Sequence, residues 1–252
     1  MPLRKILILM LLLLLAACGK KGPPRPLLLK LPASAQNLDI QQKGQRFLVS
    51  WGLPEVNQDG SPLTDLQGFQ VFKMKYDPQR DCPECRDTSV LYATIDLDYL
   101  RDVHREGNRL NLWDGGLDPG SGYQYRVVPV NRKGQSGQPA TTRRPFFLPP
   151  PPPHDLTASG HDRLVRLRWQ APLRVGFGSE MRGFNVYRRR DGGIFSLQPV
   201  NSAPLQDPEF EDFGLENGAT YNYGVRTLVA IDGWQVESAL SPSAVAVPQV
   251  GH

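Results

Sequence analysis

The residues best suited by type and spacing to do chemistry are Cys82 and Cys85, which enclose Pro83 and Glu84. A C-x-x-C pair can be a redox-active dithiol, half of a zinc site or a local disulfide. Redox use requires a βαβ context with a helix N-terminus at the pair, and the flanking sequence predicts neither. Zinc requires two further ligands, for which His104 and nearby carboxylates are candidates. A disulfide is the default in an exported chain, and both alternatives stay open.

The other residues that often act in catalysis or metal binding are scattered. The histidines occur singly, outside any ligand spacing: His104, His154, His161 and His252. Asp96, Asp98 and Asp102 lie near one another but do not follow the D-x-D-x-D-G calcium loop, so they predict a solvated acidic loop. The chain contains neither a G-x-S-x-G elbow nor a phosphate-binding glycine loop. Apart from the open alternatives at Cys82 and Cys85, the sequence therefore predicts no enzyme, no metal site and no cofactor.

Five arginines form a candidate basic patch: Arg166, Arg168, Arg188, Arg189 and Arg190. Such a patch would face anionic envelope glycans. The alternative is the solvated face of strands whose apolar residues point inward, and the alternating pattern of residues 165–169 favours it.

Residues 1–17 predict export. Arg4 and Lys5 precede an apolar run at residues 6–15, and two alanines precede Cys18. These are the parts of a secretory signal peptide, and the run is shorter than the roughly 20 apolar residues of a transmembrane helix. The Leu-Ala-Ala-Cys ending resembles the bacterial lipobox, which implies cleavage before Cys18 and lipidation of that cysteine.

Export changes how the composition is interpreted. The whole chain has a formal charge of +4 and a pI near 9.0, but removal of the signal peptide takes away Arg4 and Lys5. The remaining excess of two positive charges does not favour nucleic acid as a partner. Acyl chains on Cys18, at about 0.8 kcal/mol per buried methylene, suffice for stable membrane attachment.

Residues 18–32 predict an extended tether rich in Gly, Lys and Pro. About 15 residues at ~3 Å each span up to roughly 45 Å. Its first residues, Cys-Gly-Lys-Lys-Gly-Pro at 18–23, resemble the start of a small outer-membrane lipoprotein family tied to lipopolysaccharide-transporter assembly. That family continues with Leu-Tyr where this chain has Pro24 and Arg25, so the likeness is interpreted as a shared lipoprotein amino-terminus. Gly19, in place of an aspartate, implies export to the outer membrane by resemblance to the enterobacterial sorting rule.

The chain after the tether repeats itself. Three blocks recur in the same order: residues 48–51 and 166–169, 68–72 and 183–187, and 123–127 and 221–225. Each block alternates apolar and polar residues, which is typical of half-buried strands, and Asp-Gly turns recur between them. This pattern predicts a tandem duplication of a ~100-residue β-sandwich unit.

The third block and its surroundings resemble the E–F corner and F strand of fibronectin type III domains. The matching residues are Leu117, Pro119, Gly120, Ser121, Tyr123, Tyr125, Val127, Val130, Asn131, Gly134 and Ser136, and then Leu215, Gly218, Tyr221, Tyr223, Val225, Gly233 and Ser238. The resemblance implies that Trp51 and Trp169 are buried strand-B tryptophans. It also implies that Tyr123 and Tyr221 are tyrosine corners, with hydroxyls bonded to the upstream backbone.

The resemblance covers nearly the whole mature chain and implies an all-β fold. Residues 33–148, with an insertion, form the first fibronectin type III domain and residues 154–248 the second. Five prolines at 149–153 predict a polyproline II rod of about 15 Å that separates two independent cores. Proline tracts can also be ligands for aromatic grooves, but the domain boundary requires a linker here.

These observations predict a lipid-anchored binding or scaffolding protein of the cell outer membrane. Its partners are the membrane, through the lipid, and an envelope protein or glycan. The alternative function is that of an accessory lipoprotein in outer-membrane assembly that acts through residues 18–23.

Overall fold

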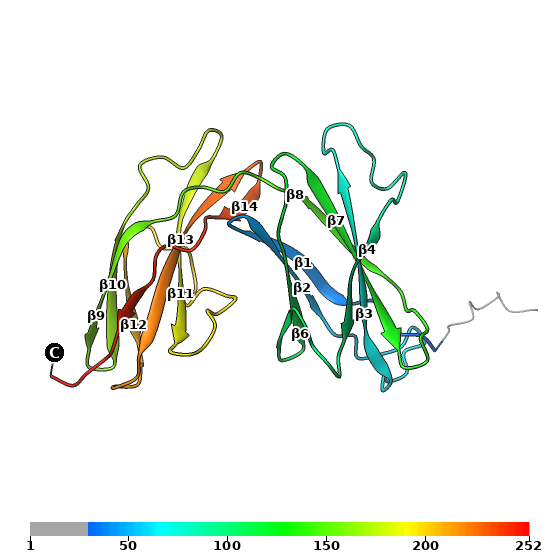
Figure 1. Cartoon of the computed structure of the whole chain (residues 1–252), viewed down its shortest axis with the longest axis horizontal. Helices are drawn as coiled ribbons and strands as arrows, with labels where there is room; N and C mark the ends of the chain where they lie inside the picture. The colour runs from blue at the N-terminus through cyan, green and yellow to red at the C-terminus, as the bar shows by residue number, and fades with distance from the viewer. Residues whose placement is uncertain (1–29, 252) are drawn as a thin grey trace, which may run out of the picture.

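The computed structural model describes residues 30–251, which form two β-sandwiches that lie side by side (Figure 1). The predicted signal peptide, Cys18 and most of the tether lie outside these residues. Within the described part of the chain, no helix is both long and apolar enough to span a membrane.

The first sandwich has two sheets. Its strands are β1 (Gln36–Lys43), β2 (Arg46–Gly52), β3 (Leu66–Tyr76), β4 (Val90–Asp96), β5 (Val103–Glu106), β6 (Arg109–Asp114), β7 (Gly122–Asn131) and β8 (Ala140–Pro145). One sheet has the order β1-β2-β6-β5 and the other β4-β3-β7-β8. Their facing apolar side chains form one buried cluster, in which Trp51 of β2 meets Phe69 of β3 edge to face at 5.7 Å between ring centroids.

The second sandwich repeats this plan. Its strands are β9 (His154–His161), β10 (Leu164–Gln170), β11 (Glu180–Arg190), β12 (Glu209–Phe213), β13 (Tyr221–Ile231), β14 (Trp234–Glu237) and β15 (Ala244–Ala246). Strands β12, β10 and β9 form one sheet in that order. In the other sheet β13 pairs with β11, β14 and β15. Trp169 of β10 meets Phe184 of β11 at 5.4 Å in a second, separate cluster.

The two sandwiches are joined by a strand pairing that the sequence did not predict. Strand β14 runs parallel to β1, with Gln42 opposite Val236 and Lys43 opposite Glu237. One eight-stranded sheet therefore extends from β11 to β5 across both sandwiches. We call this junction of β1 with β14 the seam.

The proline tract joins two sandwiches whose hydrophobic clusters are separate, as expected, but the sandwiches also contact each other directly. The tract at 149–153 follows β8 and connects the sandwiches, but Pro150 and Pro153 are buried against the protein. The chain turns back after the tract, so that the sandwiches lie beside each other in Figure 1. Main-chain pairing and side-chain burial at the seam hold them together.

Candidate functional site

Cys82 and Cys85 form a disulfide in the loop between β3 and β4. The loop is exposed, and Arg143 Nη2 of β8 lies 2.7 Å from Glu84 Oε1. Within residues 30–251 no helix begins at this pair, so the helix N-terminus that lowers the pKa of a catalytic thiol is missing there. The same residues contain no group of three or more His, Cys, Asp or Glu side chains that could hold a metal ion.

The acidic residues of the insertion do not converge on one point. Asp98 pairs with Arg132 of the neighbouring loop at 2.9 Å, and Asp96 accepts a hydrogen bond from the backbone N–H of Asp98. His104 lies 3.5 Å from Glu106 on the same exposed strand. These are local surface contacts.

Four of the five candidate arginines are paired with carboxylates. The pairs are Arg166–Glu211, Arg168–Glu209, Arg188–Asp212 and Arg190–Glu216, with N–O distances of 2.6, 3.4, 2.7 and 2.6 Å. Arg189 donates to the carbonyl of Gly193. The structure therefore shows mixed-charge strand faces in place of a basic patch.

The four predicted core residues lie where the resemblance implies. Trp51 and Trp169 are both buried. The Tyr123 hydroxyl accepts a hydrogen bond from the backbone N–H of Asp118 at 2.9 Å, and the Tyr221 hydroxyl accepts one from Glu216 at 3.2 Å. Each bond joins the start of the strand to the loop before it, which is the geometry of a tyrosine corner.

Each sandwich also contains a buried carboxylate that the sequence analysis missed. In the first, Asp114 at the end of β6 accepts hydrogen bonds from Tyr125 and Tyr92 and lies 2.5 Å from Lys73 Nζ. Asp114 is fully buried, so these donors replace the water that it loses. Burial, together with Asp114, raises the pKa of both tyrosines, which remain hydrogen-bond donors.

The second sandwich has the corresponding set. Asp212 at β12 accepts a hydrogen bond from the Tyr223 hydroxyl at 2.7 Å and two from Arg188 Nη1 at 2.9 and 2.7 Å. Burial raises the pKa of Tyr223 as well. Since the set recurs at equivalent strands, it is part of how each sandwich is built.

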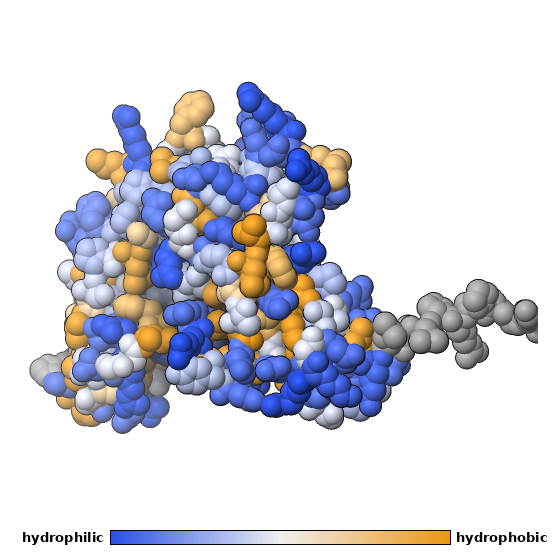
Figure 2. All heavy atoms as spheres, turned by 45° about the vertical axis from the view of Figure 1, so that its right-hand side comes forward, coloured by the Kyte–Doolittle hydropathy of each residue, from blue (hydrophilic) through white to orange (hydrophobic). Residues whose placement is uncertain are grey.

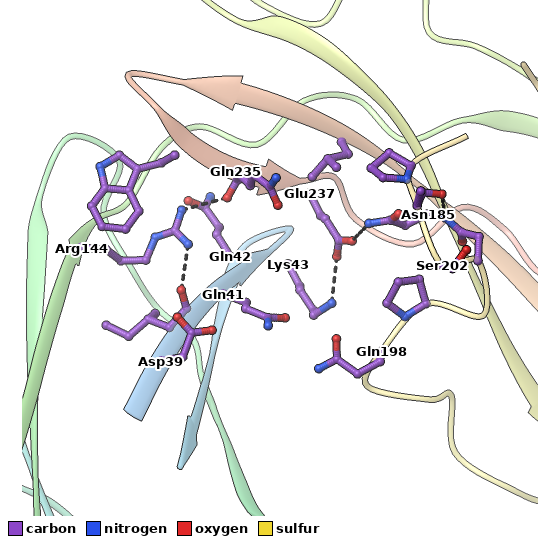
Figure 3. Close-up of a pocket in the computed structure, with 17 residues that line it drawn as sticks. Asp39, Gln41, Gln42, Lys43, Arg144, Asn185, Gln198, Ser202, Gln235 and Glu237 are labelled. Atoms are coloured by element: carbon purple, nitrogen blue, oxygen red, sulfur yellow. Dashed lines mark hydrogen bonds and ion pairs between the residues drawn. The ribbon is translucent and has the colours of Figure 1, made fainter. Parts of the chain in front are cut away.

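A different cluster, which has no counterpart elsewhere in residues 30–251, lies at the seam. Lys43 Nζ lies 3.1 Å from Glu237 Oε2, with side chains only 4% and 7% exposed. Glu237 Oε1 accepts hydrogen bonds from Tyr187 and from Asn185, both at 2.6 Å. Lys43 also donates to the Tyr187 hydroxyl at 2.7 Å. Figure 3 shows Lys43, Glu237 and Asn185 in this arrangement.

The electrostatics of this cluster follow from burial. Burial lowers the pKa of Lys43 and of Arg226, whose Nε lies 3.8 Å from Glu237, although the carboxylate opposes both shifts. Burial and Glu237 together raise the pKa of Tyr187. One carboxylate thus compensates two desolvated cations, and its loss would leave both without a counter-ion.

Arg144 forms a second tie across the seam. From β8 it donates to the carbonyl of Ile40 in β1 at 2.9 Å and to that of Gln235 in β14 at 3.0 Å. Its guanidinium lies 4.9 Å from the Trp234 ring centroid and 5.5 Å from that of Phe47. Burial lowers the pKa of Arg144 to about 10.

A cavity of about 420 Å³ lies beside these ties (Figure 3). Its walls come from both sandwiches: residues 39–43 of β1 with Arg144 on one side, and on the other β14 with residues 198–204 of the loop after β11. The main-chain N–H of Gly44, at the β1–β2 turn, donates to the carbonyl of Glu237 at 2.9 Å. This bond continues the main-chain pairing of β1 with β14 beside the cavity. The cavity therefore exists only while the sandwiches are joined.

A sequence signal for the seam is visible in retrospect. Leu48 and Ser50, on the outward face of β2, are buried, whereas the repeat places Arg166 and Arg168 at the equivalent positions of β10. A strand that is apolar on both faces is covered on both sides. In Figure 1 the loop after β11 reaches toward this face of the first sandwich.

The strand arrangement confirms the predicted fold class, an all-β chain with two tandem fibronectin type III β-sandwiches. No family model matches the sequence. One similar solved structure is a Fn3-like protein from Clostridium thermocellum, 24% identical, with a TM-score of 0.31, covering 41% of this chain and 95% of that one. Another is the FN1–FN3 domains of chicken CNTN1, 12% identical, with a TM-score of 0.36, covering 87% of this chain and 68% of that one. These likenesses concern the fold alone.

Proposed function

We propose that this protein is a non-catalytic binding or scaffolding lipoprotein of the bacterial cell envelope, held in the outer membrane by acyl chains on Cys18. The observation that carries the proposal is the seam. Because β1 and β14 share one sheet around a buried ion pair, the two sandwiches are joined directly as well as through the proline tract. Two sandwiches joined in this way present their loops in a defined relative geometry, which favours binding over catalysis here.

The loop between β10 and β11 supports contact with a protein partner. Leu173 and Phe177 in this loop are fully exposed, and Gly176 and Gly178 beside Phe177 have positive φ angles. On the face in Figure 2, by comparison, hydrophobic residues are scattered among hydrophilic ones. Exposed aromatic and aliphatic side chains on a protruding loop are suited to anchor in a pocket of another protein.

Photocrosslinking in living cells tests the partner surface. A photoreactive amino acid at Phe177 should yield a discrete crosslinked envelope protein, and the same amino acid at Ile194, an exposed residue of another loop, should not. Equal yields at both positions, or none at Phe177, would contradict this surface.

The anchor is tested separately. Cys18→Ser should abolish incorporation of a fatty-acid probe and release the protein from the outer membrane fraction. Deletion of residues 24–252 distinguishes the proposed function from the accessory-lipoprotein alternative. If residues 18–23 act alone in outer-membrane assembly, the short lipopeptide should keep the protein's activity, and if the sandwiches bind the partner, the activity should be lost.

A further inference from the structure

We propose that the cavity at the seam binds a neutral, polyhydroxylated ligand, namely an oligosaccharide of the cell envelope. The inference deepens the proposed binding function, on which it rests. It depends on the cavity's size, on the chemistry of its walls and on the pairing of its charges.

The size and polarity of the cavity fit a small hydroxyl-rich ligand. A volume of about 420 Å³ lies in the range of small-molecule sites. Within the described residues, the side chains of Gln41, Gln198, Ser202 and Gln235 line the cavity, are half-buried or exposed, and make no hydrogen bond to the protein, so their polar groups are open to a ligand. Amide and hydroxyl groups both donate and accept, as the hydroxyls of a sugar do.

The available groups stand on different walls. Figure 3 shows Gln41 on β1 and Gln198 on the loop after β11, with Gln235 on β14 above them. Convergent polar groups from three segments can fix the orientation of one ligand, whereas polar groups on a flat surface cannot.

The fixed charges of the cavity favour a neutral ligand. Lys43 is paired with Glu237, and Arg144 donates to two main-chain carbonyls. Lys43 therefore already has a carboxylate partner, and the Arg144 guanidinium is already engaged by main-chain carbonyls. A charged ligand would have to displace one of these partners from a buried cation.

Trp234 supplies the apolar contact that a sugar ring also needs. Trp234 lines the cavity and is 38% exposed, and its ring lies 4.9 Å from the Arg144 guanidinium. An aromatic ring that keeps part of its surface open can pack against the C–H groups of a sugar, while the surrounding amides bind its hydroxyls.

Calorimetric titration of the full-length protein tests the proposal. The protein should be kept in lauryldimethylamine oxide, since a glycoside detergent would compete for the cavity. The probes are chitotetraose, cellotetraose and maltotetraose, with tetragalacturonate as the charged counterpart. Saturable binding of at least one neutral tetrasaccharide and none of tetragalacturonate is expected. Binding of tetragalacturonate alone, or of no probe, would overturn the proposal.

Single variants locate the site. Gln198→Ala and Gln41→Ala should each weaken binding by about three- to tenfold, as loss of one hydrogen bond does. Gln170→Ala, at the exposed end of β10, is the matched control and should bind as the wild type does. Equal affinity of all three variants would place the sugar elsewhere. A protein that binds no sugar but still crosslinks through Phe177 would refute the cavity site and leave the proposed function standing.

Discussion

The two sandwiches share their interiors and differ on the surfaces that face each other. Both have an edge-to-face Trp–Phe contact, a tyrosine corner and a buried aspartate that accepts from a tyrosine and lies against a cation. Outside the core the equivalents diverge. Leu48 of β2 is buried where β10 has Arg166, which is exposed and pairs with Glu211. The two halves of the repeat share the residues that build each core, and the residues that differ between the halves determine how the sandwiches are joined.

One side chain shows how small that difference can be. Tyr187, whose hydroxyl contacts Lys43 and Glu237, corresponds in the repeat to Phe72, which has no hydroxyl. The position is aromatic in both sandwiches, but only the second can donate a hydrogen bond to the seam. Phe72 is half-buried and packs against the Arg126 guanidinium of its own sandwich, so the same aromatic position serves one sandwich alone in the first domain and the seam in the second.

The largest effect is expected from the shared interior. Trp51→Ala and Trp169→Ala should each destabilise their own sandwich by about 3–5 kcal/mol, because each deletes a buried aromatic side chain. Since unfolding of one sandwich also removes its half of the seam, the transition of the other should shift downward too. Calorimetric unfolding with hydrogen exchange resolves the two sandwiches. Phe213→Ala, an exposed aromatic, is the control and should change neither. An unchanged midpoint in the unmutated sandwich would show that the seam does not couple them.

The second-largest effect on stability is expected from substitutions at the seam. Glu237→Ala leaves Lys43 and Arg226 desolvated without a counter-ion and should cost about 3–5 kcal/mol. Tyr187→Phe, which installs the residue of the first sandwich, should cost about 1 kcal/mol. Small-angle scattering should report a more extended Glu237→Ala protein with both sandwiches folded. Glu216→Ala, which breaks only the exposed pair with Arg190, should leave the scattering profile unchanged. A compact Glu237→Ala variant would mean that the strand pairing alone holds the seam.

The buried tyrosines predict a decline in stability at alkaline pH. Burial raises the pKa of Tyr125 and of Tyr223, while an unfolded tyrosine loses its proton near pH 10. Their contribution is complete below pH 10. Above it the unfolded chain binds fewer protons than the folded one, so stability falls by up to about 1.4 kcal/mol per pH unit for each tyrosine.

Urea unfolding between pH 8 and pH 11 checks this prediction. Tyr125→Phe and Tyr223→Phe should each make the decline shallower by one tyrosine's share, in the first and second sandwich respectively. Parallel curves for wild type and variants would show that these hydroxyls ionise alike in both states.

The smallest effect on stability is expected from the disulfide, a feature of the first sandwich alone that lies outside the seam. The disulfide of Cys82 and Cys85 lies in an exposed loop of the first sandwich, and the second has no cysteine. The double Ser variant should lose less than about 2 kcal/mol, because so short a closed loop restrains the unfolded chain little. A thiol assay on protein purified without reductant should find no free thiol before reduction. Stoichiometric zinc in the purified protein would reverse the interpretation of this loop.

Local patterns in the sequence determined the strands, the repeat and the core. Alternation of apolar and polar residues identifies a strand and its inward face whatever the rest of the chain does, so Trp51 and Trp169 were predictable as core residues. The tyrosine corners were expected from the fibronectin type III resemblance, and the structure shows the Tyr123 hydroxyl bonded to a backbone group only five residues away. The buried aspartates were missed because an acidic residue at a strand end has the same pattern whether it is solvated or enclosed.

Only the tertiary structure decided how the two sandwiches are joined. Lys43 and Glu237 are 194 residues apart. Each belongs to a strand whose apolar and polar pattern does not indicate which other strand it pairs with. Main-chain groups at a sheet edge can pair with any other edge, so pairing alone does not select β14 for β1. The selection comes from side chains that become satisfied only together, a lysine, a glutamate and a tyrosine whose burial is tolerable in this one arrangement.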